Sequence, residues 1–182
     1  MIRSSSFWPL LVSVLTCAGD VRADAIPFGP HDVETVFFIN KSIGKNRVDY
    51  GIHLNEHCAP ANDDAMFLYW RELETSPTLR SSLGLFEYVG YGLSEQRLVH
   101  RTQAGGDQLV RLKQVDRPIL VTTKKETDGH CSAVAHARVA GVEGAVLSSV
   151  YAKLSGPLSV DYVEVHGKNP QTGAELVERV RK

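Results

Sequence analysis

Residues 33–54 read VETVFFINKSIGKNRVDYGIHL, and this stretch decides the fold class. Residues 33–40 alternate between two series and are rich in β-branched and aromatic side chains, which favours a half-buried strand. Residues 41–46 supply Ser, Gly and Asn for a turn. Residues 47–54 then place a second apolar series on one face, namely Val48, Tyr50, Ile52 and Leu54. We therefore predict a strand–turn–strand hairpin.

Short β-like segments continue along the rest of the chain. Residues 65–73 predict a third strand, with Met66, Leu68 and Trp70 on one face. Glycine-containing turns predict two hairpins, one formed by residues 93–103 and 108–115 and the other by residues 130–139 and 145–154. Two more segments, 119–124 and 160–166, read as single strands. Residues 175–181 read either as a short strand or as a frayed helix. The aromatic residues at core spacing are Phe37, Tyr50, Phe67, Trp70, Phe86 and Tyr162.

One helix is predicted over residues 75–91. Ser76 would cap it, and Pro77 would occupy its first helical position. The connections between the predicted strands are too short for parallel crossovers, which favours antiparallel pairing. The fold class is therefore mainly β, an antiparallel sandwich or partly closed barrel of about eight or nine strands with one helix packed on it.

The N-terminus has the pattern of a secretory signal peptide. Arg3 precedes a short apolar run at 7–15, and small residues surround Ala23. The run is too short to anchor the chain across a bilayer; a buried N-terminal helix is the alternative. We predict a signal peptide over 1–23 with cleavage after Ala23, an irregular lead-in over 24–32, and a single β-rich domain over 33–182. The mature protein would be periplasmic or secreted and would have no membrane span.

Composition excludes some partners. The chain has 182 residues, a formal net charge of −1 and 43% hydrophobic residues, which is ordinary for a globular domain. A charge so close to neutral argues against nucleic acid or an anionic membrane surface as a partner. The sequence contains no nucleophile elbow, no His-Glu-x-x-His motif and no phosphate-binding glycine loop. We therefore predict no catalytic residues and no cofactor.

Two cysteines, Cys58 and Cys131, remain after the predicted cleavage. An exported compartment permits a disulfide between them. Each cysteine follows a histidine, so a tetrahedral zinc site of His57, Cys58, His130 and Cys131 is an alternative. Unpaired thiols and a thiol nucleophile beside a histidine are further alternatives. Adjacent residues of a strand point to opposite faces, so the metal site would require both dipeptides to lie in loops.

Several short segments together resemble a known family. They are FFINKS at 37–42, NRVDY at 46–50, LYW at 68–70, the helix running into Tyr91–Gly92, RPI at 117–119, VDYVEVHG at 160–167, TG at 172–173 and VER at 177–179. They are similar to the bacterial family named domain of unknown function 4833, over most of residues 33–181. The resemblance implies an exported or envelope protein with a compact β-rich fold, and it brings no catalytic residues.

Three functions fit these observations. The first is a non-catalytic exported domain that binds or scaffolds something in the bacterial cell envelope. The second is an envelope hydrolase or metal-dependent enzyme that uses the His57/Cys58 and His130/Cys131 region. The third is a carrier of a small apolar ligand, which would require a large apolar cavity between the sheets.

Overall fold

The structure is a computed structural model, and it describes residues 28–181 except 77, 114, 116, 157 and 158. The predicted signal peptide and its cleavage site at Ala23 lie outside the described residues. Within this part of the chain, eleven strands form one mixed sheet, accompanied by one helix. The prediction of a mainly β fold is therefore confirmed.

The elements follow one another in the order β1 (Val33–Lys41), β2 (Arg47–Ile52), β3 (Met66–Arg71), β4 (Arg80–Ser81), α1 (Leu85–Tyr91), β5 (Leu93–Thr102), β6 (Gly105–Leu112), β7 (Pro118–Lys125), β8 (Cys131–Val139), β9 (Val142–Leu154), β10 (Val160–Lys168) and β11 (Glu175–Arg181). Residues 175–181, for which the sequence left two possibilities, form a strand.

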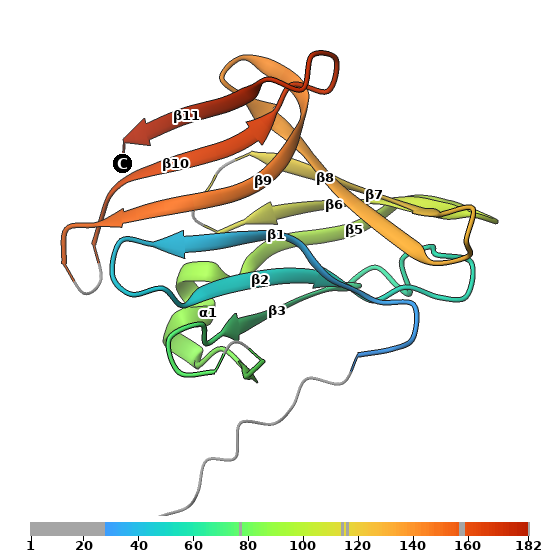
Figure 1. Cartoon of the computed structure of the whole chain (residues 1–182), viewed down its shortest axis with the longest axis horizontal. Helices are drawn as coiled ribbons and strands as arrows, with labels where there is room; N and C mark the ends of the chain where they lie inside the picture. Colours follow the sequence, from blue (N-terminus) through green and yellow to red (C-terminus); the bar gives the residue numbers. More distant parts are fainter. Residues whose placement is uncertain (1–27, 77, 114, 116, 157–158, 182) are drawn as a thin grey trace, which may run out of the picture.

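The long strand β9 joins the two halves of the sheet. The first residues of β9 pair with β8, and Ser149–Ala152 of β9 pair with β1. One half of the sheet then runs β1-β2-β3-β4 and the other runs β8-β7-β6-β5, so the sheet folds over on itself without closing (Figure 1). The hairpin of β10 and β11 extends the sheet from the opposite edge of β9. The result is a sandwich, or equally a partly open barrel.

The predicted hairpin at 33–54 is formed by β1 and β2. Phe37 lies opposite Tyr50, and the two rings stack with their centroids 4.5 Å apart. Val48, Tyr50 and Ile52 are fully buried. The alternation in this stretch therefore correctly predicted which face of β2 enters the core.

One strand pair is parallel, which differs from the predicted antiparallel pattern. β1 and β9 run in the same direction over Phe38–Lys41 and Ser149–Ala152. The prediction rested on short connections between consecutive strands, and β1 and β9 are far apart in the chain. Connection length does not restrict the direction of such a distant pair.

The predicted helix over 75–91 is wrong in its first part. α1 begins only at Leu85, and its N-cap is Gly84, whose backbone N–H is bound by the Glu87 carboxylate at 2.8 Å. The backbone N–H of Ser76 donates to the Glu72 carbonyl instead of capping a helix. The chain turns back there because Arg80–Ser81 pairs with the end of β3 as the short strand β4.

Candidate functional site

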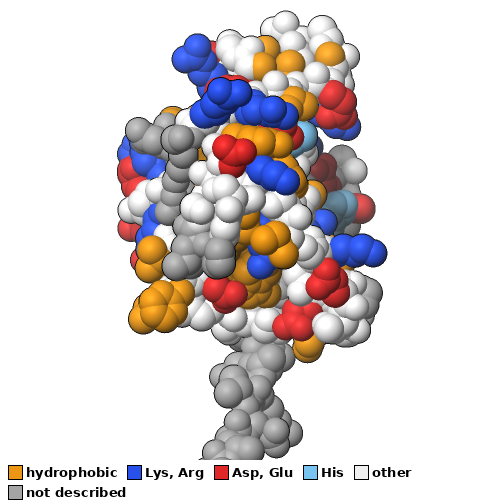
Figure 2. All heavy atoms as spheres, turned by 90° about the vertical axis from the view of Figure 1, so that its left-hand side faces the viewer, with side chains coloured by type: hydrophobic (Ala, Val, Ile, Leu, Met, Phe, Trp, Pro, Cys, Tyr) orange, Lys and Arg blue, Asp and Glu red, His pale blue; other side chains and the backbone are white. Residues whose placement is uncertain are grey.

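An apolar pocket of about 320 Å³ opens at the end of the sandwich where β1 and β9 end beside α1. We call it the mouth pocket. It is lined by residues of β1, β3, α1, β9, β10 and the segment before β7, namely Ile39, Lys41, Trp70, Phe86, Glu87, Gly90, Tyr91, Val115, Val150, Ala152, Leu154, Val160 and Val163. Figure 2 shows this end of the molecule, where hydrophobic side chains gather among basic and acidic ones. The pocket can therefore hold an apolar group.

Trp70 contributes an unusual polar atom, which is buried in the wall beside this pocket. Its side chain lies in the wall and is only 8% exposed. The indole Nε1–H is buried and has no hydrogen-bond acceptor among the described residues. A buried donor without an acceptor costs about 1–3 kcal/mol, and native proteins contain few of them. A ligand that supplies an acceptor would remove this cost if the pocket wall around Nε1 opens to admit it.

The ring of Trp70 is fixed by two neighbours. The Tyr91 ring meets it edge-on, with the centroids 5.5 Å apart. The Lys41 ammonium lies over its face, 4.5 Å from the ring centroid. This contact places a positive charge at the rim of the mouth pocket, beside the apolar wall.

A polar hollow continues from the mouth pocket. The two spaces share Lys41, Trp70 and Glu87, and the polar hollow is also lined by Asn46, Glu72, Ser81 and Ser82. The Glu72 carboxylate is oriented by the Ser81 hydroxyl at 2.9 Å and the Thr75 hydroxyl at 3.0 Å. A ligand with an apolar part and a polar end would therefore find matching surroundings for both.

Helix α1 forms one side of the pocket and is attached at its C-terminal end. The Tyr50 hydroxyl donates to the Tyr91 carbonyl at 2.5 Å. Burial raises the pKa of Tyr50 well above its usual range, with Tyr91 and Tyr88 adding to the effect. The hydroxyl therefore stays protonated and remains a donor at neutral pH.

The outer side of α1 is apolar and exposed. Leu85, Phe86 and Val89 are 80%, 88% and 58% exposed. The expectation that Phe86 belongs to the core is therefore wrong, because its helix begins later than predicted and lies at the open end. Phe86 instead contributes to the rim of the mouth pocket.

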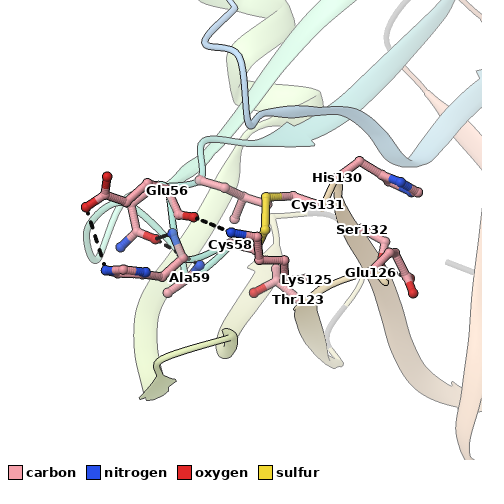
Figure 3. The surroundings of a disulfide bond; sticks show 12 residues. Glu56, Cys58, Ala59, Thr123, Lys125, Glu126, His130, Cys131 and Ser132 are labelled. Carbon is pink, nitrogen blue, oxygen red and sulfur yellow. Dashed lines mark hydrogen bonds and ion pairs between the residues drawn. A yellow bond between two sulfur atoms is a disulfide. The ribbon is translucent and has the colours of Figure 1, made fainter. Parts of the chain in front are cut away.

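The predicted disulfide is present. Cys58, in the loop between β2 and β3, is bonded to Cys131 at the start of β8 (Figure 3). Cys58 is fully buried. Because both sulfur atoms are used in this bond, neither is a free thiol in the oxidised protein.

The histidines next to these cysteines do not converge on the sulfur atoms. His57 and His130 have side chains that are 59% and 63% exposed, and each pairs with a neighbouring carboxylate, Glu56 or Asp128. His130 lies on the opposite side of the disulfide from Glu56 (Figure 3). Among the described residues, no three or more His, Cys, Asp or Glu side chains are grouped as a metal ion would require. The suggested zinc set of His57, Cys58, His130 and Cys131 is therefore not assembled.

A buried ion cluster lies on the outer face of β1–β3, and sequence reasoning missed it. The Asp49 carboxylate is fully buried. It accepts hydrogen bonds from Arg47 Nε at 2.6 Å, Arg71 Nε at 2.5 Å and the Thr35 hydroxyl at 3.0 Å. Burial alone would lower the pKa of Arg71, but the adjacent Asp49 carboxylate raises it overall. The alternation of residues in β2 predicted that Asp49 lies on the face opposite the core, but it did not predict that other side chains bury it there.

Residues 37–179 match the family described as Domain of unknown function (DUF4833). The chain belongs to this family. No curated protein and no solved structure matches this chain. Both cysteines, Asp49 and every lining residue of the mouth pocket lie within the matched span. Across the described part of this DUF4833 domain, α1 is the only helix, and it is far too short to cross a membrane.

Proposed function

We propose that this DUF4833 domain is a non-catalytic exported binding domain of the bacterial cell envelope. Its mouth pocket would take an apolar group that carries a hydrogen-bond acceptor. The volume of about 320 Å³ lies at the lower end of the range for ligand pockets. The pocket thus suits a ring system or a short acyl chain, and not a whole lipid.

The Trp70 N–H, which has no acceptor among the residues that the structure describes, carries this proposal. An apolar hollow without a polar group is a common packing defect, and it would bind a ligand with a polar atom no more tightly than one without. A buried indole donor instead favours a ligand that brings an acceptor, because binding then replaces a missing hydrogen bond. Lys41 next to the same ring attracts an acceptor with negative charge, and Glu87 in the same lining partly offsets this attraction.

Binding at the mouth is favoured over an enclosed carrier cavity. The space between the two halves of the sheet is filled by large side chains that are less than 2% exposed, such as Phe37, Tyr50 and Ile119. A carrier that encloses its ligand would need this space. The carrier hypothesis is therefore not retained, and we propose binding of one apolar group at the open end instead.

Two observations support export. The N-terminal sequence has the leader pattern described above. The Cys58–Cys131 disulfide is typical of oxidising compartments. A periplasmic or secreted location is therefore part of the proposal, and mass spectrometry of the protein isolated from its cells would test it by the mass of a chain that begins at Asp24.

Titration calorimetry with 2-naphthoate tests the pocket. This probe combines a ring system with an anionic acceptor. Trp70→Phe keeps an aromatic ring but removes the N–H, so we expect about tenfold weaker binding. Gly90→Phe should weaken binding strongly, since Gly90 lines the pocket and a Cβ added there meets no atom within 4 Å, so a large ring can be accommodated at the opening and compete with the probe for space.

Val99→Phe is the matched control, because it adds an aromatic ring at a half-exposed position of β5 that does not line the pocket. It should bind 2-naphthoate as the wild type does. The proposal fails if the wild type does not bind the probe, or if Gly90→Phe and Val99→Phe bind it equally well.

A further inference from the structure

Strand β11 forms an edge of the sheet. Among the strands that the structure describes, it pairs only with β10. Figure 1 shows it on the outer side of the β10–β11 hairpin, away from the other strands. Its seven residues read ELVERVR, from Glu175 to Arg181. Such an edge presents unpaired backbone groups to any chain that can align with it.

The hairpin turn determines which backbone groups are unpaired. The Asn169 N–H donates to the Ala174 carbonyl at 2.8 Å and the Asn169 carbonyl accepts the Gly173 N–H at 2.8 Å, so the backbone of Asn169 and the Ala174 carbonyl face each other at a hydrogen-bonding position of the hairpin. Such positions alternate along antiparallel strands, and the register of β10 and β11 is continuous from Lys168–Glu175 to Tyr162–Arg181. The backbone groups directed away from β10 therefore belong to alternate residues, which are Glu175, Val177, Arg179 and Arg181.

This edge is complementary to itself. When a second β11 runs antiparallel with Glu178 on the two-fold axis, Glu175 lies opposite Arg181 on both sides of the axis. Val177 then lies opposite Arg179, so each residue with outward backbone groups meets another of the same kind. Opposite charges that face each other across strands are stabilising, and this register overlaps the full length of the strand.

Glu178 would meet its own copy at the axis, and its charge is already compensated within each copy. Its carboxylate accepts two hydrogen bonds from the Arg117 guanidinium, at 2.8 Å and 3.1 Å. It also accepts the Ala140 N–H at 2.7 Å. Repulsion between the two carboxylates is therefore expected to be small, and it does not argue against this register.

We propose that β11 pairs with β11 of a second copy of this chain and joins two domains into one continuous sheet across a two-fold axis. This isologous arrangement uses one patch twice, as in most symmetric dimers. The inference is independent of the mouth pocket, whose lining includes no residue of β11. Its rival is an edge whose charges merely prevent association.

Sedimentation equilibrium tests the proposal through charge reversal at two exposed positions. Glu175→Arg places Arg opposite Arg, and Arg181→Glu places Glu opposite Glu. Each variant alone should dimerise about tenfold more weakly than the wild type, because both symmetric pairs become repulsive. An equimolar mixture of the two variants should recover association, since the arginine introduced in one chain then faces the glutamate introduced in the other.

Lys124→Glu is the control, because Lys124 is exposed on β7 and pairs with Glu126 in the way that Glu175 pairs with Lys168. It should dimerise as the wild type does. Recovery in the mixture identifies the register, and it cannot arise from damage to the fold of either variant. A wild type that stays monomeric at all concentrations, or a dimer that persists unchanged in both reversals, would overturn the proposal.

Discussion

Removal of the Cys58–Cys131 disulfide should strongly destabilise the domain. The bond joins residues 73 positions apart, so it excludes many conformations of the unfolded chain. The chain-entropy model assigns roughly 4 kcal/mol to a closed loop of this length. We therefore expect the double variant Cys58→Ala/Cys131→Ala to lose about 4 kcal/mol of unfolding free energy and roughly 10 °C of Tm.

Guanidinium unfolding followed by circular dichroism measures this loss. Oxidised wild type, reduced wild type and the double variant are compared, and the last two should agree within about 1 kcal/mol, because both lack the cross-link. The reasoning is refuted if the double variant loses less than about 1 kcal/mol, since constraint of the unfolded chain would then contribute little. A matching loss in the double variant and in reduced wild type would attribute the effect to the bond and not to the alanine side chains.

Three further predictions concern single residues. Asp49→Asn should cost about 2–3 kcal/mol in urea unfolding, because it removes the buried carboxylate that Arg47 and Arg71 share, although both arginines are partly exposed and Arg71 also lies near Glu34. The exposed Asp64→Asn should change stability by less than about 0.5 kcal/mol; equal effects would contradict a stabilising cluster. Burial alone raises the pKa of Asp32, but hydrogen bonds from the Gly29 and Leu54 N–H groups and from His53 lower it overall. Its stabilising effect is therefore present above the unfolded-state pKa and is lost as pH falls below about 4, so Asp32→Asn should flatten the acid side of the stability profile, and an unchanged profile would rule this out. Gly90→Ala should raise stability by about 0.5–1 kcal/mol in thermal unfolding, while Gly92→Ala should lower it, because the added Cβ would lie 2.3 Å from the Tyr88 carbonyl oxygen; effects of the same sign would disprove the explanation.

Local patterns in the sequence predicted the strands well because a two-residue period depends only on neighbouring side chains. The hairpin at 33–54 is the clearest case, because Val48, Tyr50, Ile52 and Leu54 were predicted to share one face and all four are buried. The parallel pairing of β1 with β9 was not predictable in this way. It depends on which strands, distant in the sequence, become neighbours in the sheet, and local periodicity carries no information about that.

The helix shows how a correct local signal can lose to tertiary pairing. Ser76 followed by Pro77 is a good helix start, yet the backbone of Ser76 bonds to Glu72, and Ser81 pairs with Trp70 in the sheet. Residues that the sequence assigned to a helix therefore form the short strand β4 instead, because they pair with the end of β3. The same shift moved Phe86 from the expected core to the rim of the mouth pocket.

The mouth pocket and the ion cluster were missed for a common reason. Burial of Asp49 depends on arginines from two strands, and burial of the Trp70 N–H depends on packing against β1 and α1. Sequence alternation assigned Trp70 to the core face, where an indole usually finds an acceptor. Only the spatial arrangement shows that this donor has none among the described residues. The two buried groups therefore differ. Asp49 is compensated within the fold, whereas the buried Trp70 N–H has no acceptor among the described residues and lies in the wall of an open apolar pocket. This difference is why we propose Trp70, and not Asp49, as the ligand contact.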